Sequence, residues 1–284
     1  MSRIFITGLL CVLSIGLLQA QELNTPAPSP LGTVTQIVGV TEVSVTYSRP
    51  GVKDRDIFGD LVPYGELWRT GANMSTNIKF GDDVMLNGNA VPAGEYALFT
   101  IPGKSEWTII ISPNMGPGAS KYKEEDDVAR FMVKPGTLSK SVERFTIGIA
   151  DVTDNSAQIV LSWAMTEVSF GMTVDTDANV MGQIKEVMKN PDLDDGGTYM
   201  QAAYYYYHND KDINQAFTWV NKAVELEPDA FWISRLKAQI QAKMGDYKAA
   251  IQTAEMSMKQ AEKEGSEQYV QFNKTAISEW QTKM

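Results

Sequence analysis

The spacing of apolar residues changes once along this chain, near Val174. Before that point, apolar and polar residues alternate over short runs such as Glu42 to Tyr47, which is the period of a half-buried strand. After it, apolar residues recur three or four positions apart, as in Val180 to Met188, which is the period of an amphipathic helix. One change of period predicts an α+β protein in which strands and helices form segregated domains.

The strand-rich part covers residues 31–175 and is predicted to fold as an antiparallel β-sandwich or barrel. Turn-forming pairs such as Asn87-Gly88 and Pro102-Gly103 separate its short runs, and many short strands at this spacing are typical of both architectures. One segment departs from the pattern, because Lys121 to Phe131 has the spacing of a short amphipathic helix.

Residues 176–196 predict a connecting helix and a hinge, since Pro191 and the pair Gly196-Gly197 end that helix. Residues 197–284 resemble tetratricopeptide repeats, in which pairs of helices recur about every 34 residues. Small residues and a proline stand where that repeat has them, at Ala216, Ala223, Pro228, Gly245 and Ala250. Gly265 to Met284 is expected to be a capping helix. The resemblance implies a tail that contacts a protein partner.

Two positions of this tail depart from the repeat. Tyr204 stands where a small glycine is usual, and Ser257 replaces an alanine. Tyr204 begins a run of tyrosines that ends at Tyr207, and the run has two interpretations. It could line an aromatic groove for peptides, or it could pack against the β-domain and the second helix.

The N-terminus has the pattern of a secretory signal peptide over residues 1–20. Arg3 supplies a positive charge, an apolar run extends from Ile4 to Leu18, and the small Ala20 precedes the expected cleavage site. The alternative is a retained N-terminal anchor. Residues 21–30 carry three prolines and are predicted to form an extended tether. We therefore expect an exported protein, periplasmic or extracellular, without a membrane span after cleavage.

The composition excludes several kinds of chemistry. Cys11, the only cysteine, lies within the predicted signal peptide, so thiolate catalysis and disulfides are not expected in the mature chain. His208 is the only histidine and has no catalytic motif around it. We therefore expect neither Ser-His-Asp or Cys-His catalysis nor a histidine-based zinc site. No cofactor or metal is expected. The net charge of −10 also disfavours nucleic acid as a partner.

The segment from Tyr47 to Asn77 concentrates arginine, aromatic residues, glycine and proline. Arginine forks bind carboxylates and phosphates through paired hydrogen bonds, and aromatic faces stack on sugars or cations. The segment is therefore a candidate site for a small or polymeric anionic ligand, with Arg49, Arg69 and Trp68 expected in one pocket. In the alternative interpretation, the arginines form ion pairs with nearby acids and lock the loop. Those acids are Asp54, Asp56, Asp60 and Glu66.

The strings YSRPG, RDIFG, LVPYG and WRTGAN, followed by VPAGEYALFTIP and WTIII, resemble a secreted bacterial family known as domain of unknown function 2911. The resemblance covers about residues 31–175. It implies a β-domain and no established reaction. The motif positions carried over are Arg49, Arg55, Trp68, Arg69, Gly71 and Asn73, and Tyr47 completes the candidate ligand-binding set. An acidic residue usually follows G-A-N in this pattern, whereas Met74 stands here, so an acidic site residue could have been lost.

Residues Asp175 to Glu186 resemble a calcium-binding loop, but Val180 occupies the position that needs glycine. The same segment also has the pattern of a helix start. Together these patterns favour an exported two-domain binding protein. Two other functions remain open: a hydrolase or lyase that uses carboxylates and arginines, and a structural envelope scaffold without a ligand.

Overall fold

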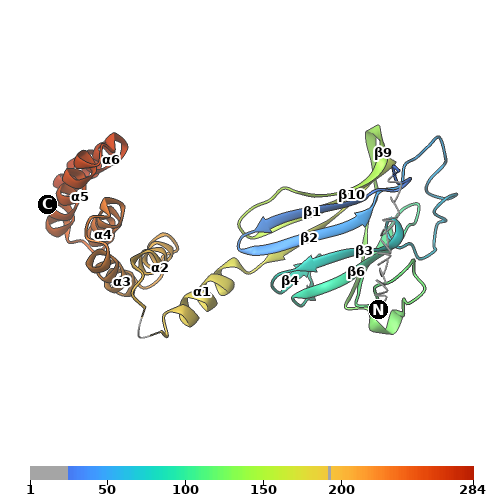
Figure 1. Cartoon of the computed structure of the whole chain (residues 1–284), viewed down its shortest axis with the longest axis horizontal. Helices are drawn as coiled ribbons and strands as arrows, with labels where there is room; N and C mark the ends of the chain where they lie inside the picture. Colours follow the sequence, from blue (N-terminus) through green and yellow to red (C-terminus); the bar gives the residue numbers. More distant parts are fainter. Residues whose placement is uncertain (1–24, 191–192) are drawn as a thin grey trace, which may run out of the picture. The chain divides into compact units, whose positions relative to one another are not determined.

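The computed structural model describes residues 25–190 and 193–284. The predicted signal peptide, the tether residues before Thr25, and Pro191 of the predicted hinge lie outside the described residues. The chain divides into two compact units, one ending at Thr176 and the other beginning at Asp177 (Figure 1). The first contains antiparallel sheets and the second a run of helices, so the predicted α+β fold with segregated domains is confirmed.

The described residues of the β unit form two antiparallel sheets. The larger has strand order β1-β2-β3-β6-β7-β8, and the smaller has β5-β4-β10-β9. In Figure 1, β1, β2, β3 and β6 run beside one another in the larger sheet. The strands are β1 (Leu31–Val38), β2 (Thr41–Ser48), β3 (Ala72–Phe80), β4 (Val84–Leu86), β5 (Asn89–Val91), β6 (Gly94–Ile101), β7 (Trp107–Ser112), β8 (Ala129–Val133), β9 (Gly136–Ala150) and β10 (Ser156–Val174).

Apolar residues of both sheets form one buried cluster. The fully buried residues of this cluster include Val43 and Val45 of β2 and Ile78 of β3. Phe145 of β9 and Phe170 of β10 are each only 1% exposed. Burying each such side chain contributes about 1.5–3 kcal/mol. Because a shift of one residue would turn a whole strand over, this burial sets which face of each strand points inward.

The Asn87-Gly88 pair joins β4 to β5 as the sequence predicts. Both residues have left-handed backbone, with φ of 46° at Asn87 and 81° at Gly88. A two-residue hairpin turn whose twist matches the strands requires positive φ at both positions, and asparagine followed by glycine tolerates this best.

The helix predicted over Lys121 to Phe131 is wrong. The structure has a single 3₁₀ turn, η1 (Glu124–Asp126), and then β8. Residues Ala129 to Val133 pair with β7, and the Phe131 ring lies 5.7 Å from that of Phe170. Strand pairing and burial at this site override the local helical spacing.

Three polar side chains hold the segment before β8. The Tyr122 hydroxyl and the Arg130 Nε each donate a hydrogen bond of 3.0 Å to Asp127 Oδ2. Arg130 also forms an ion pair with Asp127 at 2.9 Å. Burial, and then the hydrogen bond to Asp127, raises the pKa of Tyr122 to about 12.

The raised pKa of Tyr122 predicts an alkaline loss of stability. Because the folded state holds the phenolic proton more tightly than the unfolded chain, the stabilisation is fully present below about pH 10 and is lost as pH rises through about 12. Tyr122→Phe removes this proton. Between roughly pH 9 and pH 12, the melting temperature of the parent chain should therefore fall further than that of the variant. Equal declines in the two proteins would contradict this expectation.

Among the described residues, the second unit contains helices α1 to α6, of which α2 to α6 contact one another in chain order (Figure 1). Aspartates cap three of them: the carboxylates of Asp195, Asp212 and Asp246 accept backbone N–H groups at the starts of α2, α3 and α5. The helices are α1 (Thr176–Val187), α2 (Gly196–His208), α3 (Ile213–Leu226), α4 (Phe231–Lys243), α5 (Tyr247–Lys263) and α6 (Glu267–Gln281).

Small residues allow these helices to approach closely. Ala216 and Ala223 of α3 and Ala250 of α5 are fully buried. Ser257, which departs from the repeat pattern, is also buried, and its hydroxyl donates to the Phe231 carbonyl at 2.7 Å. That hydroxyl accepts a hydrogen bond from Asn273 Nδ2 at 2.9 Å, which ties α6 to α5. No helix among the described residues is long and apolar enough to cross a membrane.

Candidate ligand-binding site

The arginine-rich segment forms an ordered loop between β2 and β3. Ile57 and Val62 are buried, and the backbone N–H of Val62 donates to the Ile57 carbonyl at 2.8 Å. Further along, the backbone groups of Trp68 and Thr100 exchange two hydrogen bonds, of 2.8 and 2.9 Å. These contacts attach both halves of the loop to the β core, so its side chains have fixed positions.

Trp68 is part of that core. It is 8% exposed, and its indole N–H donates to the Gly71 carbonyl at 3.0 Å. Its ring stacks on Trp163 at 5.8 Å and meets the edge of Phe145 at 5.1 Å. The sequence predicts the Trp68 ring as the apolar wall of a ligand pocket, but in the structure this ring packs largely against other rings.

The TGAN motif has unusual backbone geometry. Thr70 and Asn73 have left-handed backbone, with φ of 57° and 61°, and Gly71 has φ of 149°. A Cβ added to Gly71 would lie 2.9 Å from the backbone oxygen of Ser48. Thr76 supports the turn, because its hydroxyl donates to the Thr70 carbonyl. Left-handed threonine is costly, and such strain persists only where the surroundings enforce it.

Two of the predicted site arginines bind backbone carbonyls. Arg49 donates to the Phe145 carbonyl at 3.1 Å and to Thr146 Oγ1 at 2.8 Å, both in β9. Arg55 donates within its own loop, to the carbonyls of Val52 at 3.0 Å and Gly51 at 2.6 Å. Among the described residues, no ion pair joins Arg49, Arg55 or Arg69 to a loop acid. The loop is thus held by carbonyl acceptors and not by the ion pairs considered above.

The other polar residues of the predicted set have partners of their own. Tyr47 is buried, and its hydroxyl bonds both backbone groups of Ile147 on β9, at 2.7 and 3.1 Å. Asn73 Nδ2 donates to Ser48 Oγ at 3.2 Å.

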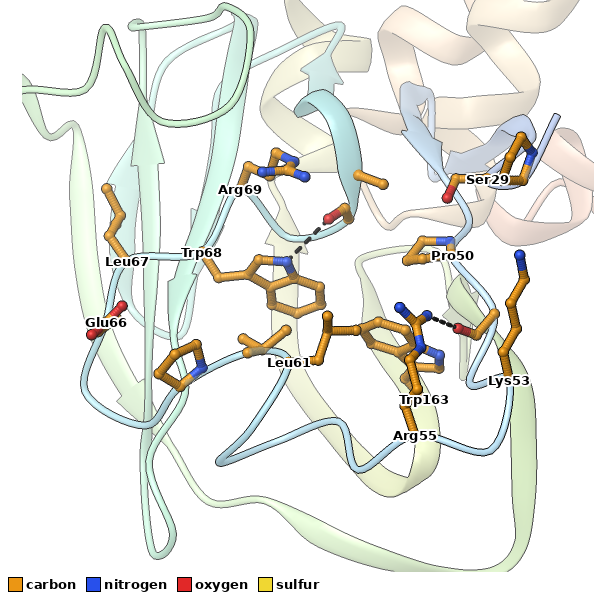
Figure 2. A pocket seen from close by; sticks show the side chains of 16 residues that line it. Ser29, Pro50, Lys53, Arg55, Leu61, Glu66, Leu67, Trp68, Arg69 and Trp163 are labelled. Carbon is orange, nitrogen blue, oxygen red and sulfur yellow. Dashed lines mark hydrogen bonds between the residues drawn. The ribbon is translucent and has the colours of Figure 1, made fainter.

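A cavity of about 380 Å³ opens beside this loop. Figure 2 shows the side chains that line it. They include six residues with charged or indole groups: Lys53, Arg55, Glu66, Trp68, Arg69 and Trp163. Of the predicted set, the structure therefore brings Arg55, Trp68 and Arg69 together. It does not place Arg49, Tyr47 or Asn73 in this lining, and their polar groups bond residues of β9 and β2.

Two residues of the cavity lining carry a side-chain donor atom without a hydrogen-bond partner among the described residues. Arg69 Nε and Trp163 Nε1 are both buried and have no hydrogen-bond partner among the described residues. Trp163 is 2% exposed. Three cations line the cavity, at Lys53, Arg55 and Arg69, against one carboxylate, Glu66, in a chain whose overall charge is −10. The charged groups of the cavity lining are therefore mostly positive.

Comparison with protein families identifies the β unit. The family described as Protein of unknown function (DUF2911) matches residues 29–172. The chain belongs to this family. Searches of curated proteins and of solved structures gave no match. The DUF2911 region includes both sheets, except for the last two residues of β10, and the six charged or indole cavity residues named above.

Sequence reasoning missed two contributors to the cavity of this DUF2911 domain. Trp163 lies on β10 and was assigned only to an alternating strand, because its neighbours in the loop are about a hundred positions away. Pro28 and Ser29 of the tether also line the cavity. The Pro28 carbonyl accepts a hydrogen bond from Arg144 at 3.1 Å, and the Pro30 carbonyl accepts the Arg49 backbone N–H at 2.9 Å. A proline run alone gave no signal of such docking.

The calcium-like segment after the DUF2911 region is helical from Thr176 onward. The Asp177 carboxylate accepts hydrogen bonds from Lys211 Nζ at 2.8 Å and from the Tyr205 hydroxyl at 2.9 Å. These two contacts, led by that of Lys211, lower the pKa of Asp177. No group of three or more His, Cys, Asp or Glu within residues 25–190 and 193–284 could hold a metal ion.

Proposed function

We propose that this chain is an exported two-domain binding protein. Its DUF2911 domain binds an anionic or carbohydrate-like ligand in the cavity beside Arg69, and its helical unit, with tetratricopeptide-like helix pairs, makes protein contacts. The proposal of export rests on the signal pattern of residues 1–20, and the protein would act in the periplasm or outside the cell.

The observation that carries the ligand proposal is the charge of the cavity lining, which has three cations, Lys53, Arg55 and Arg69, and one carboxylate, Glu66. The excess of cations favours acceptors that carry negative charge. The volume of about 380 Å³ suits a small ligand or one unit of a polymer.

The other two functions have less support from this geometry. Acid–base hydrolysis without histidine needs two facing carboxylates, and among the described residues the cavity lining has one, Glu66. A filled loop region would be evidence for a scaffold without a ligand, whereas this loop borders a cavity.

Arg69→Gln tests the ligand site. Removing one charge-assisted contact should weaken binding by about 1.5–3 kcal/mol, or roughly 10- to 150-fold in Kd. The measurement is isothermal titration of the full chain with glucuronate, N-acetylmuramate and a sulfated monosaccharide.

Arg49→Gln is the matched control. Arg49 lies outside the cavity lining and bonds β9, so its loss should lower the melting temperature and leave ligand affinity unchanged. The proposal is contradicted if no probe binds the parent chain, or if Arg69→Gln binds every probe as tightly as the parent does.

A further inference from the structure

Two cavities of the helical unit meet on α4. One has a volume of about 350 Å³ and is lined by aromatic residues that include Tyr204, Trp232 and Tyr269. The other has a volume of about 570 Å³ and includes the cations Lys243 and Lys283. Both are lined by Arg235, Gln239 and Phe272. We call the two together the α4 groove, with an aromatic end and a basic end.

The α4 groove runs over alternate helices. Its aromatic end takes residues from α2, α4 and α6, and α4 contacts both of the other two. Because consecutive helices in the unit also contact one another, α2, α4 and α6 form one face of it, and α3 and α5 lie between them along the chain (Figure 1).

Arg235 lies where the two ends meet and has no acidic partner among the described residues. Its guanidinium lies 5.0 Å from the Phe272 ring and makes a long hydrogen bond of 3.4 Å to Asn273 Oδ1. Burial lowers the pKa of Arg235. Unlike Arg235, both lysines of the basic end have an acidic partner. Lys243 pairs with Asp210 at 2.6 Å, and Lys283 pairs with Glu279 at 2.5 Å.

Large aromatic side chains stand exposed around this arginine. Tyr204 is 52% exposed, and Trp232 and Phe272 are each 43% exposed. The tyrosine run divides between two places in the unit, because Tyr204 lines the groove and Tyr206 packs 4.7 Å from Trp219. Exposed aromatic residues gathered around a partly desolvated cation are the usual composition of a protein-binding anchor region.

We propose that the α4 groove binds an extended segment of a partner protein through an acidic side chain within that segment. The carboxylate pairs with Arg235, and a neighbouring apolar side chain packs on Trp232 and Phe272. This deepens the proposed role of the helical unit in protein contacts and rests on it. The groove continues on both sides of Arg235, so a partner that ended at this carboxylate would leave one of the two cavities unfilled.

A display library tests this proposal. Random dodecapeptides held inside a carrier loop, with no free C-terminus, are selected on the immobilised full chain. Enriched peptides should share an acidic residue with an aliphatic or aromatic residue within three positions. A synthetic winner with acetylated and amidated ends should lose at least about tenfold in affinity when its acid becomes the amide, as expected for a charge-assisted contact.

Arg235→Gln keeps an amide donor for Asn273 and removes the charge. It should weaken the winner by the same factor, and the acid-to-amide change in the peptide should then have no further effect. Trp232→Ala, at an exposed position, should weaken the winner independently. Lys248→Gln is the control, since Lys248 is exposed on α5 and lines neither end of the groove.

Two results would overturn the proposal. One is the absence of any enriched peptide on the parent chain, and the other is an acid preference that persists in Arg235→Gln. Peptides that bind only with a free C-terminal carboxylate would also refute an internal acid. Arg69→Gln is measured in parallel and should bind the peptide normally, so failure of the groove and failure of the DUF2911 cavity are distinguishable.

Discussion

Trp68→Ala is expected to lower the free energy of unfolding of the β unit by about 3–5 kcal/mol, the usual range for emptying a large aromatic site. The side chain is 8% exposed and packs against the rings of Trp163 and Phe145, so its loss leaves a void that those rigid neighbours cannot close. The Gly71 carbonyl also loses its indole donor. Urea denaturation followed by the β-sheet circular dichroism signal measures the change.

Trp232→Ala is the matched control for Trp68→Ala, because it makes the same chemical change at a side chain that is 43% exposed. Its cost to the free energy of unfolding should be clearly smaller than that of Trp68→Ala, since 43% of its surface stays in contact with solvent in the folded protein. If the two variants lost similar stability, Trp68 would not be a core residue.

Gly71→Val is expected to destabilise the β unit by roughly 2–5 kcal/mol, from the positive φ and from overpacking together. The backbone at Gly71 has φ of 149°, and an added Cβ would lie 2.9 Å from the Ser48 carbonyl oxygen. Because that oxygen belongs to β2, it cannot move away as the end of a flexible side chain could. Thermal and urea unfolding of the variant measure the loss.

Gly148→Val is the control for Gly71→Val, because it makes the same chemical change where the backbone and the neighbours leave room. Gly148 lies in β9, and a Cβ there would meet no atom within 4 Å. Valine favours strands, so this substitution should leave stability unchanged or raise it slightly. A loss at Gly148 as large as that at Gly71 would show that the effect is general to glycines of these sheets.

Much of the fold could be predicted from the sequence because it depends on local patterns. The alternation in Thr41–Ser48 and the Asn87-Gly88 turn each follow from residues within a few positions of one another. The segment from Lys121 to Phe131 failed for the opposite reason. Its strand exists because β7 pairs with it, and no local spacing reports that partner.

The candidate site was harder to predict because its contacts are distant in sequence. The arginine-rich loop stood out by composition, but Arg49 finds its acceptors on β9, nearly a hundred residues away. Trp163, which brings the second unpartnered donor, is likewise remote from Arg69 in the chain. Composition could point to the loop, whereas the division of its arginines between holding the fold and facing the cavity needed the three-dimensional structure.

The docking of Pro28 and Ser29 at the cavity has a practical consequence for recombinant work. An affinity tag placed just before Thr25 would be attached three residues from Pro28 in the cavity wall. An acidic or histidine-rich tag could then bind the cations of the cavity and block ligands. Ligand screens are therefore best done on protein that carries its tag after Met284, where the chain belongs to the other unit.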